Sequence, residues 1–288
     1  MVQEISPYKL NNQYDPAKQP APECRALVFQ KVGDFNPPYV HRTGDDFLPT
    51  VGEVEEICPG IEWRYAFCVA GEDYFLKVSD EVLPETEEFF FERITHLRLS
   101  GRGPRHQMFA MFTGRHLYTW YKSVRFCGAC GARMEHSDRE RAMCCPECGA
   151  VCYPRLMPAV IVAVVSGDKL LVTKYNRRNV THYALVAGFT EIGETFEETV
   201  AREVMEEAGL AVTDISYYKS QPWGIAEDML AGFFCRVTGD DTITMDTGEL
   251  REARWVTREE IELQEDTLSL TNEMMTVFKR GEDPFHRK

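Results

Sequence analysis

Short runs of aromatic and β-branched residues in the first third of the chain predict β-strands. Residues 25–29, 64–69 and 73–78 each have this composition and a length typical of a strand. Residues 87–99 carry apolar side chains at a helical period, so we expect a helix there. This part of the chain therefore predicts an α+β domain, and it carries no motif that indicates a separate function.

A longer apolar run opens the second half of the chain. Residues 159–165 (AVIVAVV) are continuously apolar, as in a strand covered on both faces. Residues 195–208 contain no Gly or Pro and predict a helix that ends at Gly209. An apolar row on this helix is suited to packing on a sheet: Phe196, Val200 and Val204. Further elements are predicted as strands at 170–174, 182–186, 233–237 and 254–256 and as a terminal helix at 272–279.

Three glutamates share one face of the helix predicted at 195–208. Glu203 and Glu207 are four residues apart and Glu206 is three from Glu203, so their side chains project together. A hard cation such as Mg²⁺ would offset their repulsion, because it takes carboxylate oxygens and bridges to phosphates. The alternative is a solvated acidic face. The preceding Gly-x5-Glu loop and Arg202 favour the metal site, and we expect Arg202 to orient the glutamates.

Four of the ten cysteines form two C-x-x-C pairs separated by fourteen residues: Cys127, Cys130, Cys145 and Cys148. Each pair is followed by Gly, which allows a tight turn that brings backbone amides to the sulfur. Four thiolates suit a tetrahedral, structural Zn²⁺. Disulfides are the alternative, which we disfavour because nothing in the sequence indicates secretion. The remaining thiols are expected to be reduced and mostly buried: Cys24, Cys58, Cys68, Cys144, Cys152 and Cys235.

Residues 188–210 (GFTEIGETFEETVAREVMEEAGL) meet every specified position of the Nudix pattern Gly-x5-Glu-x7-Arg-Glu-apolar-x-Glu-Glu-x-Gly-apolar. A Y-P-R-x-x-P-A segment at 153–159 and the tetrapeptide S-Q-P-W at 220–223 accompany it. Together with the two cysteine pairs, which would form a zinc ribbon, these motifs resemble those of the zinc-ribbon NADH pyrophosphatase (NAD diphosphatase) branch of the Nudix hydrolase superfamily. The resemblance implies an α/β protein, a Nudix α/β/α sandwich with a mixed sheet. The expected domains are an N-terminal α+β domain with a flexible polar arm (1–123), a zinc ribbon (124–156) and a Nudix hydrolase domain (157–288).

The resemblance also implies a catalytic centre that holds Mg²⁺ or Mn²⁺. Glu203 and Glu207 are the expected ligands, with Glu206 as a candidate third. Glu249 matches a distant glutamate that completes the site, although a solvated turn acid is the alternative. Ala187 matches a residue whose backbone carbonyl binds metal. The sequence leaves open which carboxylate takes the proton from water, and Glu207 is our choice.

The expected substrate site includes Glu140, Tyr153 and Phe189, of which the aromatics would enclose a nicotinamide or, alternatively, be core. The family motif S-Q-P-W-P-F-P-x-S is followed only as far as its tryptophan, and G-I-A-E-D replaces the rest. An aromatic and two prolines are lost, so the preference among NADH, NAD and ADP-ribose is open. The substrate-binding residues expected from this motif are Gln221, Pro222, Trp223, Gly224, Ile225, Ala226, Glu227 and Asp228.

The expected reaction is hydrolysis of the diphosphate of NAD(H)-type dinucleotides to AMP and nicotinamide mononucleotide by a homodimer. Removal of NAD caps from RNA is a second expected activity. The rivals are an ADP-ribose or broad nucleoside-diphosphate pyrophosphatase and a non-catalytic regulator that binds nucleic acid through the ribbon. A net charge of −14 argues against broad nucleic-acid binding. A non-catalytic regulator is disfavoured because every carboxylate that the Nudix pattern specifies is present.

Length and composition set the remaining expectations. The 288 residues predict two or three domains, and a hydrophobic fraction of 44% supports sizeable cores. No apolar run reaches the roughly 18–20 residues of a membrane span. Residues 1–20 lack the basic start and apolar segment of a signal peptide. We therefore expect a cytoplasmic protein without a membrane partner.

Overall fold

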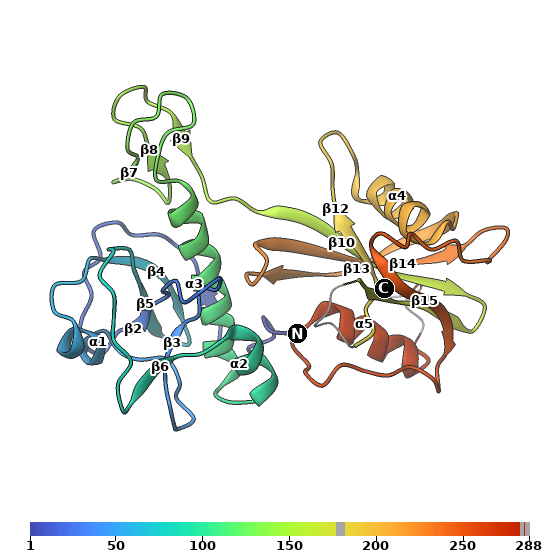
Figure 1. Ribbon diagram of the computed structural model, residues 1–288, viewed down its shortest axis with the longest axis horizontal. Helices are drawn as coiled ribbons and strands as arrows, with labels where there is room; N and C mark the ends of the chain where they lie inside the picture. The colour runs from blue at the N-terminus through green and yellow to red at the C-terminus, as the bar shows by residue number, and fades with distance from the viewer. Residues whose placement is uncertain (177–181, 283–284, 286–288) are drawn as a thin grey trace. The chain divides into compact units, whose positions relative to one another are not determined.

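The computed structural model describes residues 1–176, 182–282 and 285. The chain forms two compact units (Figure 1). The first contains residues 2–155 together with Trp223–Glu227, and the second contains Met1, Leu156–Pro222 and Asp228–Lys288. The ribbon residues thus group with the N-terminal residues, while the three-domain division stays a prediction. None of the described helices is long and apolar enough to cross a membrane.

The N-terminal part of the first unit is built on a four-stranded sheet in the order β1-β4-β5-β2 and a two-stranded sheet β3-β6. Helix α3 lies over the larger sheet. It can approach β2 closely because Gly114 has no side chain; a Cβ there would lie 2.6 Å from Leu27 Cδ1. The elements are β1 (Leu10–Asn11), β2 (Arg25–Leu27), β3 (Tyr39–His41), α1 (Val51–Ile57), β4 (Trp63–Val69), β5 (Glu72–Lys77), β6 (Phe89–Phe91), α2 (Ile94–Ser100) and α3 (Arg105–Ser123).

The three strands predicted in this region are confirmed as β2, β4 and β5, but the predicted helix is wrong in part. Residues 87–99 are not one helix, because Phe89–Phe91 pairs with Tyr39–His41 as a strand and only the residues from Ile94 onward are helical. Residues 115–123 form the second half of α3, with Trp120 buried. Strand pairing and burial, both tertiary effects, decide these segments.

The N-terminal residues are attached to the sheet. Leu10–Asn11 pairs with β4 as strand β1, and Lys18 Nζ lies 2.6 Å from Asp73 Oδ1. Tyr14 packs against the buried core of the unit. The described contacts therefore differ from those of a free polar arm.

The ribbon is a three-stranded antiparallel sheet in the order β7-β8-β9. Its strands are β7 (Glu135–His136), β8 (Met143–Cys144) and β9 (Val151–Cys152). Trp120 at the end of α3 packs against Cys127, Met134, Met143 and Cys145, so the ribbon shares a small core with that helix.

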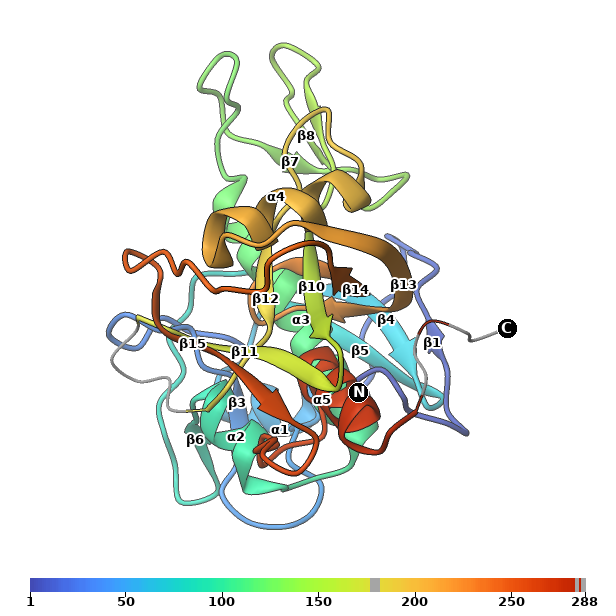
Figure 2. The same ribbon diagram turned by 90° about the vertical axis from the view of Figure 1, so that its right-hand side faces the viewer.

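The second unit is an α/β/α sandwich around a six-stranded mixed sheet, as expected. The order is β13-β14-β10-β11-β15, with β12 paired to β10. Strand β10 runs parallel to β14 and antiparallel to β11 and β12. Helices α4 and α5 both contact β10 and lie on opposite faces of the sheet (Figure 2). The elements are β10 (Met157–Ser166), β11 (Lys169–Tyr175), β12 (Val186–Phe189), α4 (Phe196–Ala208), β13 (Val212–Trp223), β14 (Asp228–Val237), β15 (Leu250–Thr257) and α5 (Leu270–Lys279).

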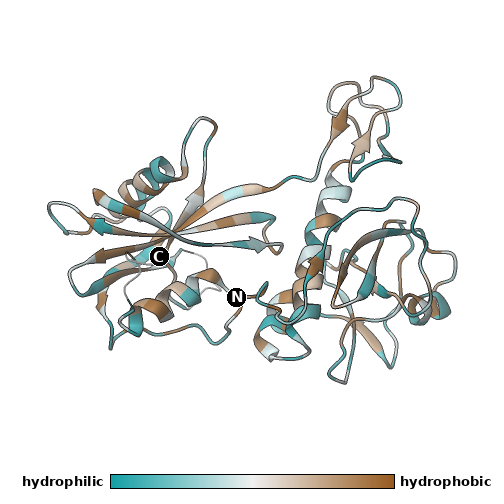
Figure 3. Cartoon of the chain, turned by 180° about the vertical axis from the view of Figure 1, so that it is seen from behind, coloured by the Kyte–Doolittle hydropathy of each residue, from teal (hydrophilic) through white to brown (hydrophobic). Residues whose placement is uncertain are grey.

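The central strands of this sheet are strongly hydrophobic (Figure 3), as a sheet covered on both faces requires. Val160, Val162 and Val164 of β10 pack with Val200 and Val204 of α4. Most predicted strands and both predicted helices are confirmed, but β12 begins only at residue 186. Strand β13 was not anticipated, because it lies at the sheet edge with many polar, half-exposed residues.

Candidate active site and zinc centre

Helix α4 carries the candidate catalytic glutamates, and local capping fixes both of its ends. Thr195 accepts a hydrogen bond from the backbone N–H of Glu198, whose carboxylate accepts one from the N–H of Thr195 in return. Gly209 ends the helix with a φ of 69°. Val200 and Val204 are buried against the sheet, so the rotation of α4 is fixed and its glutamate face is set.

Glu207 is a buried carboxyl group without a hydrogen-bond partner. Glu207 is 2% exposed, and neither carboxyl oxygen makes a hydrogen bond of normal geometry, although the backbone N–H of Ala187 is close enough to lower its pKa. Burial, followed by the nearby charges of Glu203 and Glu249, raises its pKa to about 8. Burial of an unpaired charge is costly, so a bound cation would stabilise this group. This donor is therefore suited to a hard divalent ion.

Glu203 lies beside Glu207 against the β12 backbone. Its side chain is 12% exposed, and burial raises its pKa while the Arg202 guanidinium opposes that change. A Cβ at Gly188 would lie 1.9 Å from the carboxyl carbon of Glu203. The box glycine thus leaves the space that the Glu203 carboxylate occupies.

Arg202 holds the loop and the helix together. Its Nε lies 2.6 Å from Glu194 Oε1, and its Nη1 lies 2.7 Å from Glu203 Oε1. It also donates to the carbonyl of Phe189 at 2.9 Å and to the exposed Glu206 at 3.0 Å. Hydrogen bonding to Arg202 lowers the pKa of Glu194 to about 2. This arrangement supports the expectation that Arg202 orients the glutamates.

Glu249 is exposed in the turn before β15, and its negative charge raises the pKa of Glu207. Ala187 lies in β12, where it pairs with Ile161 of β10. The carboxylates of the three expected ligands do not gather as a preformed cluster. Among the described residues, the cysteine set is the only group of three or more His, Cys, Asp or Glu with all ligand atoms within 4.8 Å.

Two residues near these glutamates were not singled out from the sequence. Asp246 contributes a negative charge near Glu207, and its backbone N–H donates to the Glu207 carbonyl at 3.0 Å. Tyr175 is the second of these residues. Its burial, followed by the negative charges of Glu207, Glu203 and Glu249, raises its pKa. The only sequence signal for Asp246 is its position three residues before Glu249, and Tyr175 has none.

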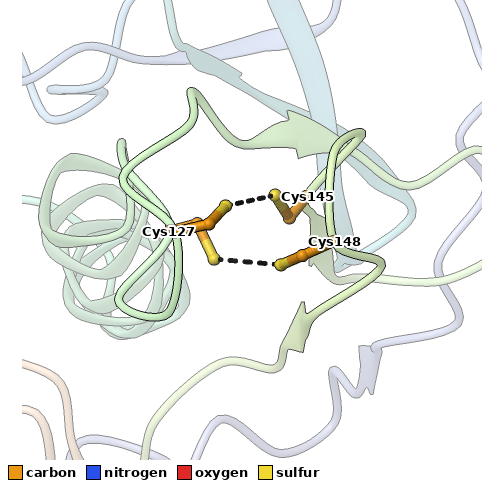
Figure 4. A group of neighbouring side chains, drawn as sticks. Cys127, Cys145 and Cys148 are labelled. Carbon is orange, nitrogen blue, oxygen red and sulfur yellow. Dashed lines mark hydrogen bonds between the residues drawn. The ribbon is translucent and has the colours of Figure 1, made fainter.

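The four predicted zinc ligands converge in the ribbon (Figure 4). The two knuckles have the same backbone pattern: Cys127 N–H donates to Ala132 O at 2.8 Å, and Cys145 N–H donates to Ala150 O at 2.8 Å. Gly131 and Gly149 have φ of 78° and 74°, as the predicted turns require. Hydrogen bonding from the backbone N–H of Ala129 lowers the pKa of Cys127, which favours the thiolate that zinc binds.

The residues expected at the substrate lie in both units. Glu140 and Tyr153 belong to the first unit, where the Tyr153 hydroxyl donates to Glu140 Oε1 at 2.9 Å. Tyr153 is 56% exposed, and Phe189, in the second unit, is 52% exposed. Both aromatics are therefore available to a ligand rather than core.

The Q-P-W segment and its continuation carry a packing role. Gln221 is fully buried, and its amide forms hydrogen bonds of 2.7 Å each with the backbone of Leu268 and Leu270. The ring of Trp223 meets Phe112 of α3 edge-on at 5.4 Å. A Cβ at Gly224 would lie 2.0 Å from Phe112 O.

The rest of this segment is held in the same way. Arg115 donates to the carbonyls of Gly224 and Ile225. Ala226 is exposed, Glu227 has a φ of 68°, and Asp228 is buried at the start of β14. Pro222 is half-buried. The close fit of Gly224 on α3 gives a physical reason for glycine where the family motif has proline.

Comparison with protein families confirms the resemblance drawn from the motifs. Residues 155–276 match the NUDIX domain, and residues 122–153 match the NADH pyrophosphatase zinc ribbon domain. The ribbon match and the four gathered cysteines together support a structural zinc ion.

The chain is similar to curated proteins over about half its length. It is 41% identical over 142 residues to the NAD-capped RNA hydrolase NudC of Pectobacterium atrosepticum, covering 49% of this chain and 54% of that protein. It is 39% identical over 150 residues to the same-named protein of Shigella flexneri, covering 52% and 58%. A crystal structure of a Nudix hydrolase from Nitrosomonas europaea aligns with a TM-score of 0.49 and 22% identity, covering 56% of this chain and 96% of that one.

Proposed function

We propose that this chain, which carries a Nudix domain behind the zinc ribbon of NADH pyrophosphatases, hydrolyses the diphosphate bond of NAD(H)-type dinucleotides. The products would be AMP and nicotinamide mononucleotide. The observation that carries this proposal is Glu207, whose buried and unpartnered carboxyl lies beside Glu203 on the helix that the Nudix pattern predicts. An ionised carboxyl in this buried position lowers the stability of the fold unless a cation neutralises it. The hydrolysis of a diphosphate by a Nudix enzyme uses such a divalent cation.

Glu203, Glu207 and Glu249, with the carbonyl of Ala187, are the residues that we propose hold Mg²⁺ or Mn²⁺. The ion would screen the phosphate oxygens and lower the pKa of the attacking water. Arg202 keeps Glu203 in place through its 2.7 Å contact. Glu207 is our candidate for accepting the proton from water, because burial raises its pKa and no side chain donates a hydrogen bond to its carboxyl.

Removal of NAD caps from RNA is the second activity that we propose. The relatives named NAD-capped RNA hydrolase support it through 41% identity over 142 residues and 39% identity over 150 residues. Because this chain spans only about half the length of those relatives, the activity stays a proposal. We further propose a homodimer in the reducing cytoplasm, where zinc-bound thiolates are retained.

Hydrolysis of ADP-ribose is the alternative that a specific observation favours. Residues 224–228 (GIAED), which replace the family's P-F-P-x-S motif, contain no aromatic side chain, so they offer no ring to a nicotinamide. Tyr153 and Phe189 remain exposed and are the aromatics that we propose enclose that ring. ADP-ribose lacks the ring and would not need them.

A substrate panel tests these assignments. Purified zinc-loaded protein is incubated with NADH, NAD, ADP-ribose or NAD-capped RNA in the presence of Mg²⁺ or Mn²⁺, and products are identified by mass. Cleavage of NADH or NAD to AMP and the mononucleotide supports the proposal. Brisk cleavage of ADP-ribose with negligible cleavage of NADH and NAD would replace it by the alternative. Phe189→Ala and Tyr153→Ala should weaken NADH turnover more than ADP-ribose turnover.

A further inference from the structure

A cavity outside the Nudix domain gathers charged side chains that the proposed reaction does not use. It measures about 420 Å³ and lies between strands β4 and β5, the C-terminal end of α3 and the first part of the ribbon. Its lining residues fall between positions 62 and 143, so none of the catalytic glutamates contributes. A cavity of this size falls within the roughly 300–1,000 Å³ of small-ligand sites.

The lining of this cavity is positively charged in an otherwise acidic protein. Five Lys or Arg and three Asp or Glu give it a net charge of +2, whereas the whole chain has −14. The charged lining residues are Arg64, Lys77, Lys122, Arg125, Arg133, Glu62, Asp80 and Glu135. The local charge therefore attracts anions although the protein as a whole repels them.

Several donors in this lining are only partly satisfied. Lys77 is 5% exposed, and its Nζ has Ser79 O at 2.6 Å and Glu81 Oε2 at 3.5 Å. Arg64 bonds Glu62 through Nη2, but its Nε is buried without a hydrogen-bond partner. His136 Nδ1 is likewise buried without a partner. Within the described part of the chain, Arg133 has no ion-pair partner. Buried polar groups normally find partners, so Arg64 Nε and His136 Nδ1 are able to bond an anion, whereas Arg133 is exposed and contributes positive charge to the lining.

We propose that this cavity binds a small phosphate-bearing anion, either inorganic phosphate or a phosphate monoester. The partly satisfied donors project from three elements, β4, β5 and the ribbon. A phosphate group can accept hydrogen bonds from all three on different oxygens, whereas a carboxylate has only two oxygens. Arginine forks suit phosphate oxygens, as charge-assisted hydrogen bonds. Because Arg64 and Lys77 belong to the sheet while Arg133 and His136 belong to the ribbon, the bound anion would tie the ribbon to the sheet.

Isothermal titration of the full-length, zinc-loaded protein with inorganic phosphate and with AMP, in buffer without Mg²⁺ or Mn²⁺, tests this site. Arg133→Gln removes one lining charge without breaking a described ion pair. Arg139→Gln is the matched control, because Arg139 lies in the same ribbon, is almost fully exposed and does not line the cavity. We expect saturable binding that weakens about tenfold in Arg133→Gln and less than twofold in Arg139→Gln. Adenosine, which lacks a phosphate, should not bind.

The imidazole of His136 gives a second, local readout. Burial, and then the charge of Arg64, lower its pKa to about 4. A bound anion would raise that pKa, which an NMR titration of the His136 ring with and without phosphate measures. Equal affinity for phosphate and AMP would show that the phosphate alone is recognised, and tighter AMP binding would identify a nucleoside monoester; both uphold the site.

Three results would overturn the assignment. Absence of saturable binding together with an unchanged His136 pKa would show that the cavity takes no phosphate. Equal weakening in Arg133→Gln and Arg139→Gln would show general charge attraction. Loss of binding in Glu207→Gln would place the anion at the Nudix glutamates, whereas retained binding separates this site from the proposed catalytic function.

Discussion

Replacement of Glu207 by Gln is expected to stabilise the magnesium-free protein while abolishing hydrolysis. The carboxyl of Glu207 is buried without a partner, and its pKa is raised from 4.5 to about 8. Between these two pH values the folded state holds a proton that the unfolded state has released. The stability that this group contributes is therefore fully present below about pH 4.5 and is lost as the pH rises to 8.

The magnitude follows from the same pKa values. A rise of this size corresponds to roughly 4–5 kcal/mol of lost stability at pH 8 in the absence of a metal ion. Glutamine cannot ionise and escapes that penalty, but its buried amide lacks partners and costs about 1–3 kcal/mol. The variant should thus be more stable than the wild type by a few kcal/mol at pH 8, and no more stable at pH 4.5.

Urea denaturation at both pH values, in zinc-loaded protein with and without Mn²⁺, measures this difference. Mn²⁺ should stabilise the wild type through binding to the folded state, with a much smaller effect on Glu207→Gln. Hydrolysis of NADH should be lost in the variant although its zinc content is unchanged. A variant that is less stable than wild type at pH 8 without Mn²⁺, or that gains equal stability from Mn²⁺, would refute the reasoning.

Three further substitutions, one with a matched control, probe the residues around the glutamates and the zinc centre. Arg202→Lys keeps the charge but loses the guanidinium fork, so affinity for Mn²⁺ and hydrolysis should fall about 10–100-fold in a metal titration and a rate assay; unchanged affinity would contradict its role. Gly188→Ala would place a methyl group on the Glu203 carboxylate, so activity should be lost with little change in the urea midpoint, and retained activity would disprove this steric argument. Cys145→Ser should release zinc and loosen the ribbon, whereas Cys144→Ser should retain zinc by elemental analysis.

Features that depend on neighbours in the chain could be predicted from the sequence. The box helix, the glutamates on one face of it and the glycine that ends it are local, because they follow from helical spacing and capping. The two knuckles are also local, since each consists of a C-x-x-C pair and a glycine with positive φ. The continuous apolar run at β10 correctly indicated a strand covered on both faces.

Features that depend on distant segments were decided only by the tertiary structure. Only part of the segment predicted as one helix at 87–99 is helical, because Phe89–Phe91 pairs with Tyr39–His41 as a strand. The burial of Gln221 is likewise a tertiary feature, because its amide nitrogen and oxygen bond the backbone of Leu268 and Leu270. The pKa of Glu207 depends on burial and on the charge of Glu249, forty-two positions away in the chain. Sequence spacing assigns the residue types for this chemistry, while burial and electrostatic contacts across the fold determine their free energies, because both arise between segments that only folding brings together.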